Sequence, residues 1–175
     1  SANTKGFANA GPKVGPIVIS EIMYRPPDVS TNGALWDNTE EEYVELYNIS
    51  GATVPLWDPN AITNTWRLDE AVEYAFPPTT TMSAGERVLV TSFSPTNTPM
   101  VNAFRAKYNI SPSIRIFGPY DGRLRNSSES VRLLQPDVVR FYATNIVITG
   151  VVIDEVEYAD LAPWPVAADG IGPAL

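Results

Sequence analysis

Apolar and polar residues alternate with a period of two along several short segments of the chain, and this pattern predicts β-strands. In residues 41–50, Val44 and Leu46 fall on one face, whereas Tyr43 and Glu45 fall on the other. Other segments share a high content of β-branched and aromatic residues and are bounded by turn residues. The strands expected on these grounds span residues 17–24, 41–50, 53–57, 65–77, 87–93, 114–120, 130–137 and 146–158.

Two of these segments leave alternatives open. Residues 65–77 alternate well enough to form either one strand or a bent pair of strands. Residues 146–158 form a long β-branched tract, which we interpret as a hairpin interrupted at Gly150 because glycine weakens a strand interior.

One segment, residues 99–110, has the period of a helix. Val101, Phe104 and Tyr108 follow one another at positions i, i+3 and i+7, and Pro99 stands near the start. A proline in the first turn and apolar residues on one face are typical of a short amphipathic helix. We therefore expect a helical excursion between two strands.

The number and spacing of the strands indicate the fold class. Seven or more short strands, turn signals at intervals of about ten residues and 16 prolines favour an all-β, immunoglobulin-like antiparallel β-sandwich with one short helical excursion. A jelly roll is the second choice. Residues 1–15 have the composition of a flexible linker, and residues 16–175 are long enough for one domain.

Composition removes most catalytic chemistry. The chain has no cysteine and no histidine, so it lacks thiolate nucleophiles, histidine bases and the common ligands of transition metals. Lys and Arg total 12 against 20 Asp and Glu, which gives a net charge of −8 and argues against nucleic acid as a partner. Carboxylates are what remains for chemistry.

The chain also lacks the sequence signals of membrane insertion. No apolar run reaches the roughly 18–20 residues that a transmembrane helix needs, and the first residues lack the apolar stretch of a signal peptide. The chain does not begin with methionine. We therefore expect it to be a segment of a longer protein, and to be monomeric as an isolated domain.

Clustered carboxylates give the candidate metal site. Asp37, Glu40 and Glu41 lie close together in sequence, beside Glu42, and Ca²⁺ accepts such oxygen ligands in irregular geometry. The spacing lacks the pattern of a dedicated calcium loop, so a solvated acidic loop is the leading interpretation. Glu42 and Glu45 fall on opposite faces of a strand and cannot form a catalytic pair by themselves. For Glu42 we expect a hydrogen bond to a neighbouring loop or ordinary solvation.

Two tryptophans are the candidate ligand-binding residues. Trp36 stands alone in a polar insertion, and we expect it to be exposed or to cover a sheet edge. Trp164 lies among prolines and glycines that restrict the chain, and we expect it to cover one end of the sandwich. Exposed aromatic rings on β-sandwiches can stack on sugars, so a glycan-binding role is the alternative for both residues.

Four sequence blocks, in order, carry a resemblance to a known family. They are ISEIMY from residue 19, EYVELYN from residue 42, the G-x-L-x-N-S-x-E-x-V-x-L block at residues 122–133, and the P-W-P-x-A-A-D-G-x-G-P block at residues 163–173. Together they resemble the bacterial lamin tail domain over about residues 16–175. The chain departs from a minimal version of that family at Trp36–Glu42, at residues 93–113 and at Phe141–Thr149.

The resemblance implies an immunoglobulin-like sandwich but no activity. Such domains occur in nuclear lamins and in large secreted or surface-attached bacterial proteins. We therefore expect a non-catalytic interaction or spacer module of a larger extracytoplasmic protein, which binds a protein or a cell-surface glycan or positions adjacent domains. The alternatives are a calcium-dependent carbohydrate-binding domain and a carboxylate-based glycoside hydrolase. Apart from that calcium ion, no cofactor is expected.

Overall fold

The computed structural model describes residues 15–142, 145–165, 168–170 and 174–175, and it describes side chains outside residues 138–149. The predicted linker therefore lies, apart from Gly15, outside the described residues.

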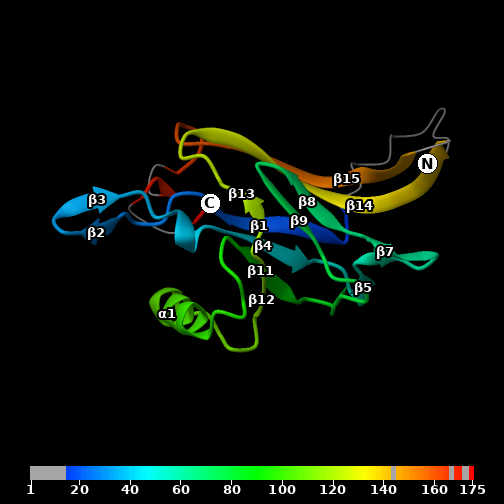
Figure 1. Cartoon of the computed structure of the whole chain (residues 1–175), viewed down its shortest axis with the longest axis horizontal. Coiled ribbons are helices and arrows are strands. Elements are labelled where there is room, and N and C mark those ends of the chain that lie inside the picture. Colours follow the sequence, from blue (N-terminus) through cyan, green and yellow to red (C-terminus); the bar gives the residue numbers. More distant parts are fainter. Residues whose placement is uncertain (1–14, 143–144, 166–167, 171–173) are drawn as a thin grey trace.

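Figure 1 shows the arrangement of the elements. In chain order they are β1 (Ile17–Met23), β2 (Val29–Thr31), β3 (Ala34–Trp36), the 3₁₀ helix η1 (Thr39–Glu41), β4 (Tyr43–Asn48), β5 (Val54–Pro55), β6 (Trp57–Asp58), β7 (Ala61–Thr65), β8 (Arg67–Glu70), β9 (Val72–Ala75), β10 (Thr81–Met82), β11 (Arg87–Thr91), α1 (Thr98–Tyr108), β12 (Arg115–Phe117), β13 (Asp121–Gly122), β14 (Ser128–Tyr142) and β15 (Asn145–Ala159).

Two sheets form the body of the molecule. The first has the order β1-β4-β11-β12, and the second has the order β13-β9-β8-β14-β15. Among the described residues, every strand pair is antiparallel except β11 with β12. A parallel pair needs a crossover connection, and α1 lies on the crossover between these two strands. The immunoglobulin-like β-sandwich with one helical excursion is confirmed. Among the described residues, no helix has the length and apolarity needed to span a bilayer.

The core lies between the inner faces of the two sheets. Val44 and Leu46 of β4 are buried there, as the alternation predicts, and Leu68 and Val131 contribute from the second sheet. Trp66 is the largest fully buried side chain. Because burial of apolar surface is the main favourable term in folding, these alternating positions hold the two layers together.

Helix α1 covers part of the outer face of the first sheet. Phe104 packs there with Met23, Tyr43 and Leu89, which point away from the main core. Asn97 caps the helix start by accepting a hydrogen bond from the Met100 N–H at 3.3 Å. The helix predicted for residues 99–110 is thus confirmed with a slightly earlier start and end, and its outer-face contacts bury Tyr43 on the face opposite Val44.

The prediction of a hairpin interrupted at Gly150 is wrong. Strand β15 runs without a break from Asn145 to Ala159, and Gly150 pairs with Pro136 of β14 within this ladder. A Cβ atom at Gly150 would lie 3.0 Å from the Cβ of Leu134. Glycine therefore permits close packing here and does not mark a turn. The bent pair allowed for residues 65–77 is present as β8 and β9.

Asn48, at the end of β4, joins three segments. Its side chain is fully buried, and Nδ2 donates to the main-chain carbonyls of Ala52 at 2.9 Å, Met82 at 3.0 Å and Ser83 at 2.9 Å. Oδ1 accepts from the main-chain N–H of Ser50 at 2.9 Å. These bonds fix the turn that follows β4 against the turn that precedes β11.

Replacing Asn48 with alanine is expected to lower the free energy of unfolding by about 2–4 kcal/mol, because three carbonyls lose their donor. Urea unfolding measures this change. Asn102, exposed on α1, is the matched control, and its alanine variant should unfold within about 0.5 kcal/mol of the parent. Equal loss in the two variants would contradict the role assigned to Asn48.

Candidate functional site

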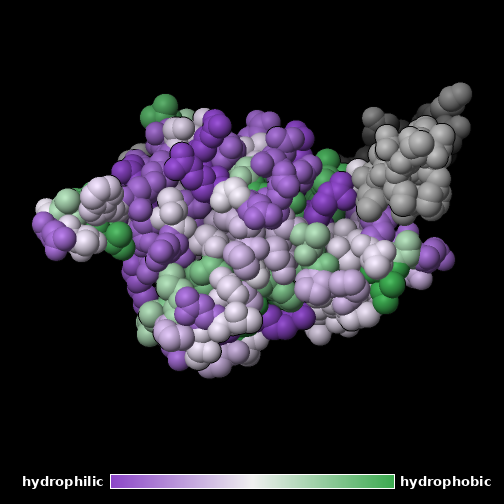
Figure 2. Space-filling model, in the orientation of Figure 1, coloured by the Kyte–Doolittle hydropathy of each residue, from purple (hydrophilic) through white to green (hydrophobic). Residues whose placement is uncertain are grey.

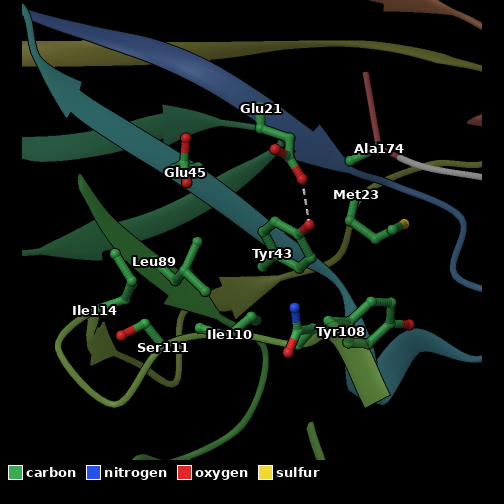
Figure 3. Close-up of a pocket in the computed structure, with 11 residues that line it drawn as sticks. Glu21, Met23, Tyr43, Glu45, Leu89, Tyr108, Ile110, Ser111, Ile114 and Ala174 are labelled. Atoms are coloured by element: carbon green, nitrogen blue, oxygen red, sulfur yellow. Dashed lines mark hydrogen bonds between the residues drawn. The ribbon is translucent and has the colours of Figure 1, made fainter. Parts of the chain in front are cut away.

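A groove lies on the outer face of the first sheet, beside the C-terminal end of α1 (Figure 3), and has a volume of about 390 Å³. Neighbouring strands supply one side, and the segment that follows α1 supplies the other. The strand residues are Glu21, Met23, Tyr43, Glu45 and Leu89, and the remaining lining residues are Tyr108, Asn109, Ile110, Ser111, Ile114 and Ala174.

Two carboxylates stand side by side on the strand wall. Glu21 of β1 and Glu45 of β4 are direct cross-strand partners, an arrangement that is unfavourable for like charges unless donors compensate it. The hydroxyl of Tyr43 donates to Glu21, as Figure 3 shows, and Arg87 forms an ion pair with Glu45. Burial, together with the bond to Glu21, raises the pKa of Tyr43, so this hydroxyl stays a donor.

Aliphatic side chains make up much of the rest of the groove. Met23 and Leu89 come from the sheet, and the half-buried Ile110 and Ile114 come from the segment after the helix. The groove therefore combines apolar surface with two adjacent carboxylates. This combination suits a ligand that carries both an apolar group and a positive charge.

Glu41 holds the helix side of the groove in place. Its Oε2 atom accepts from the hydroxyl of Tyr108 at 2.8 Å and from Asn38 Nδ2 at 2.7 Å, and it forms an ion pair with Lys107. Burial alone would raise the pKa of Glu41, but the hydrogen bonds from Lys107, Tyr108 and Asn38 lower it. These contacts connect η1 to the last turn of α1.

The candidate metal ligands lie in different surroundings. Asp37 and Glu40 are exposed, whereas Glu41 is half-buried and bonded to the three donors described above. Within the part of the chain that the structure describes, no three acidic side chains lie close enough together to hold a metal ion. The three predicted ligands are thus neighbours in sequence but do not gather around one point.

Trp36 is the last residue of β3 and lies at the base of the β2–β3 hairpin, which projects from one end of the molecule (Figures 1 and 2). Its side chain is 62% exposed, and Leu35 and Val29 of the same hairpin are also exposed. Trp164, by contrast, is half-buried and packs against the main core. The structure therefore places the two candidate ligand-binding tryptophans in unlike environments and does not bring them together.

The full burial of Glu42 was not predicted from the sequence. Only 1% of this residue is exposed, and its Oε2 atom accepts from the hydroxyl of Tyr120 at 3.0 Å and the main-chain N–H of Leu124 at 2.9 Å. Burial raises the pKa of Glu42 to about 7. The signal was present, because a period of two places Glu42 on the same face as the core residues Val44 and Leu46.

The raised pKa of Glu42 predicts a pH-dependent stability. The folded protein binds a proton here that the unfolded chain, with an ordinary pKa of 4.5, has lost, so stability falls as pH rises from that value through about 7. The loss should reach about 3 kcal/mol by pH 8, and Glu42→Gln, which stays neutral, should not show it.

Urea unfolding at pH values from about 5 to 8 tests this prediction, since it spans the titration of the buried carboxyl. The exposed Glu73 supplies the control variant Glu73→Gln, which should keep the parent's pH profile. Parallel profiles for the parent and Glu42→Gln would count against a carboxyl with a raised pKa.

Comparison with known proteins agrees with this geometry. A search of curated proteins finds no match. The sequence model of the Lamin Tail Domain family matches residues 10–160, which include the groove strands, α1 and all strands of the second sheet. The match covers most of the chain, and the structure has the immunoglobulin-like sandwich. This chain therefore belongs to the Lamin Tail Domain family.

Proposed function

We propose that this domain is a non-catalytic module of a larger extracytoplasmic bacterial protein and that it binds a segment of a partner protein in the groove beside α1. The observation that carries the proposal is the pair of adjacent carboxylates, Glu21 and Glu45, above the aliphatic side chains of Met23 and Leu89. A segment with a lysine or arginine beside an apolar residue complements both features. The extracytoplasmic location is an expectation from the family resemblance.

The bonding of the groove carboxylates supports binding over hydrolysis. Glycoside hydrolysis needs one carboxyl free to donate a proton and a second free to act as base or nucleophile. Glu21 here accepts from Tyr43, and Glu45 is engaged by Arg87 and by the hydroxyl of Ser20 at 2.7 Å. Both carboxylates are thus engaged by donors of the domain itself, and the groove has the acidic character of a docking surface.

The shape of the aromatic contacts favours a peptide over a sugar in this groove. Sugars stack on open ring faces, but the Tyr43 ring is almost fully buried and makes edge-to-face contacts with Phe104 and Tyr108. Most of the apolar lining that remains, from Met23, Leu89, Ile110 and Ile114, is aliphatic, and Tyr108 adds one half-buried ring. An extended segment with one small or medium apolar side chain fits it better.

A peptide-display experiment tests the proposal. Random ten-residue peptides selected on the domain should be enriched in a basic residue next to an aliphatic one. Glu21→Gln should weaken the selected peptides about tenfold, because one charge-assisted contact is lost. Ser111→Trp, at an exposed position that lines the groove, should block binding by filling it.

The outcome is read from Kd values measured by calorimetry. Glu73→Gln serves as the control, because Glu73 is an exposed carboxylate outside the groove, and its Kd should match the parent's. Enrichment of acidic peptides, or equal affinity of the parent and Ser111→Trp, would refute a groove that binds basic segments.

Exposed Trp36 favours a second candidate function, the binding of a glycan at the β2–β3 hairpin. Its side chain is 62% exposed and lies opposite the exposed Val29 across the hairpin, and an exposed ring of this kind can stack on a sugar. A glycan array probed with the parent and with Trp36→Ala, each with Ca²⁺ and with chelator, distinguishes the cases. Glycan binding that requires Trp36 would support this candidate, and absence of binding under all conditions would exclude it from the array's glycans.

A further inference from the structure

A second hollow lies at the other end of α1, away from the groove. Its volume is about 330 Å³, and its wall includes Asn97 and Met100 from the start of the helix. Glu40 of η1 and the buried Glu42 line it together with Arg123. Nothing in the proposed function uses this hollow, and none of its lining residues belongs to the groove.

The Glu42 carboxylate has bonding capacity that the described residues leave unused. Both donors that reach it, Tyr120 and Leu124, bond to Oε2, while Oε1 is buried and has no hydrogen-bond partner. Leaving a buried acceptor without a hydrogen-bond donor costs free energy, and the cost is larger when the acceptor is a carboxylate. The side chain is therefore suited to a ligand that brings hydrogen-bond donors.

The surroundings of Glu42 indicate which donor fits. Glu40 adds a second carboxylate, and Ser92 and Asn97 line the hollow with neutral polar side chains. Phe93 and Met100 supply apolar wall. A primary ammonium has three donors and no acceptor, and a short alkyl chain attached to it would contact the apolar wall. Two carboxylates give too few charged ligands for a typical calcium site.

We propose that this hollow binds a primary alkylammonium group, as carried by a lysine side chain of another protein or by a small amine, with Glu42 as the main partner of the ammonium. Arg123 lines the same hollow and is exposed. As a like charge it opposes the ligand, so its removal is expected to strengthen binding. An anionic ligand would show the reverse dependence on Arg123.

Binding is linked to the titration of Glu42. Asp37 acts to raise its pKa and Arg123 to lower it, but burial dominates, and the pKa of about 7 means that an ammonium must displace a proton at lower pH. Tyr120 faces the same carboxylate and remains a neutral donor, because burial raises its pKa as well. Affinity should therefore rise about tenfold between about pH 6 and pH 8.

The test is a titration of the domain with n-butylammonium chloride, followed by the amide NMR signal of Leu124, whose N–H donates to Glu42. Saturable shifts with a millimolar Kd are expected at pH 8, and 1-butanol, which lacks the charge, should give none. Glu42→Gln should weaken binding at least about tenfold, and Arg123→Ala should strengthen it about threefold. Glu73→Gln is the control and should bind as the parent does.

A second titration separates the two sources of the ligand. If Nα-acetyl-lysine methylamide binds as tightly as n-butylammonium, the site is open to lysine side chains. If only n-butylammonium binds, the site takes small amines alone. The proposal is overturned by the absence of saturable shifts up to about 100 mM, by equal binding of 1-butanol, by unchanged affinity in Glu42→Gln, or by weaker binding in Arg123→Ala. Failure here leaves the groove proposal standing, because the two sites share no residue.

Discussion

Burial of strand β4 on both faces is the constraint on which the rest of the structure depends. Its inward residues Val44 and Leu46 meet the second sheet, and its outward residue Tyr43 lies under α1. A strand at the centre of a sandwich normally leaves its outer face to solvent. Here the outer face carries apolar side chains, so the chain must supply a cover, and the excursion between β11 and β12 supplies it.

The cover creates both candidate binding sites. Helix α1 is short and covers only part of the sheet. A gap therefore remains at each end of the helix, and side chains from η1 and the loops only partly fill these gaps. The gap at Tyr108 is the groove, and the gap at Asn97 is the hollow that contains Glu42. The ion pair between Glu41 and Lys107 connects η1 to the last turn of α1, next to the groove.

Four glutamates on β1, on η1 and in the segment from η1 into β4 show that surroundings, and not composition, decide what a carboxylate does. Glu21 and Glu45 are opposed across a strand pair and receive donors, and Glu41 is tied to a lysine and a tyrosine. Glu42 is adjacent to Glu41 in sequence, yet it is sealed in the interior with a raised pKa. Each environment follows from the face of the chain on which the residue lies.

Local patterns predicted the helix and the longer strands of the two sheets, but not the short strands β2, β3, β10 and β13, and not the sites. The alternation in β4 and the helical spacing of Phe104 and Tyr108 depend only on near neighbours, so they could be read directly. The partners of Glu42 lie 78 and 82 residues away, at Tyr120 and Leu124, and no local pattern encodes that distance. The same holds for Gly150, whose role in β15 depends on close approach to Leu134 of the partner strand.

The outward apolar residues of the first sheet have a consequence for how this domain can vary between relatives. The sheet can carry Met23, Tyr43 and Leu89 on its outer face only because the helix covers them. Without the helix they would form an exposed apolar patch that promotes association. A relative whose β11–β12 crossover carries no helix must therefore carry hydrophilic residues at all three positions. The presence of the helix and the polarity of these strand positions should covary across the family, and insertion of a helix into a relative that lacks it would require all three substitutions at once.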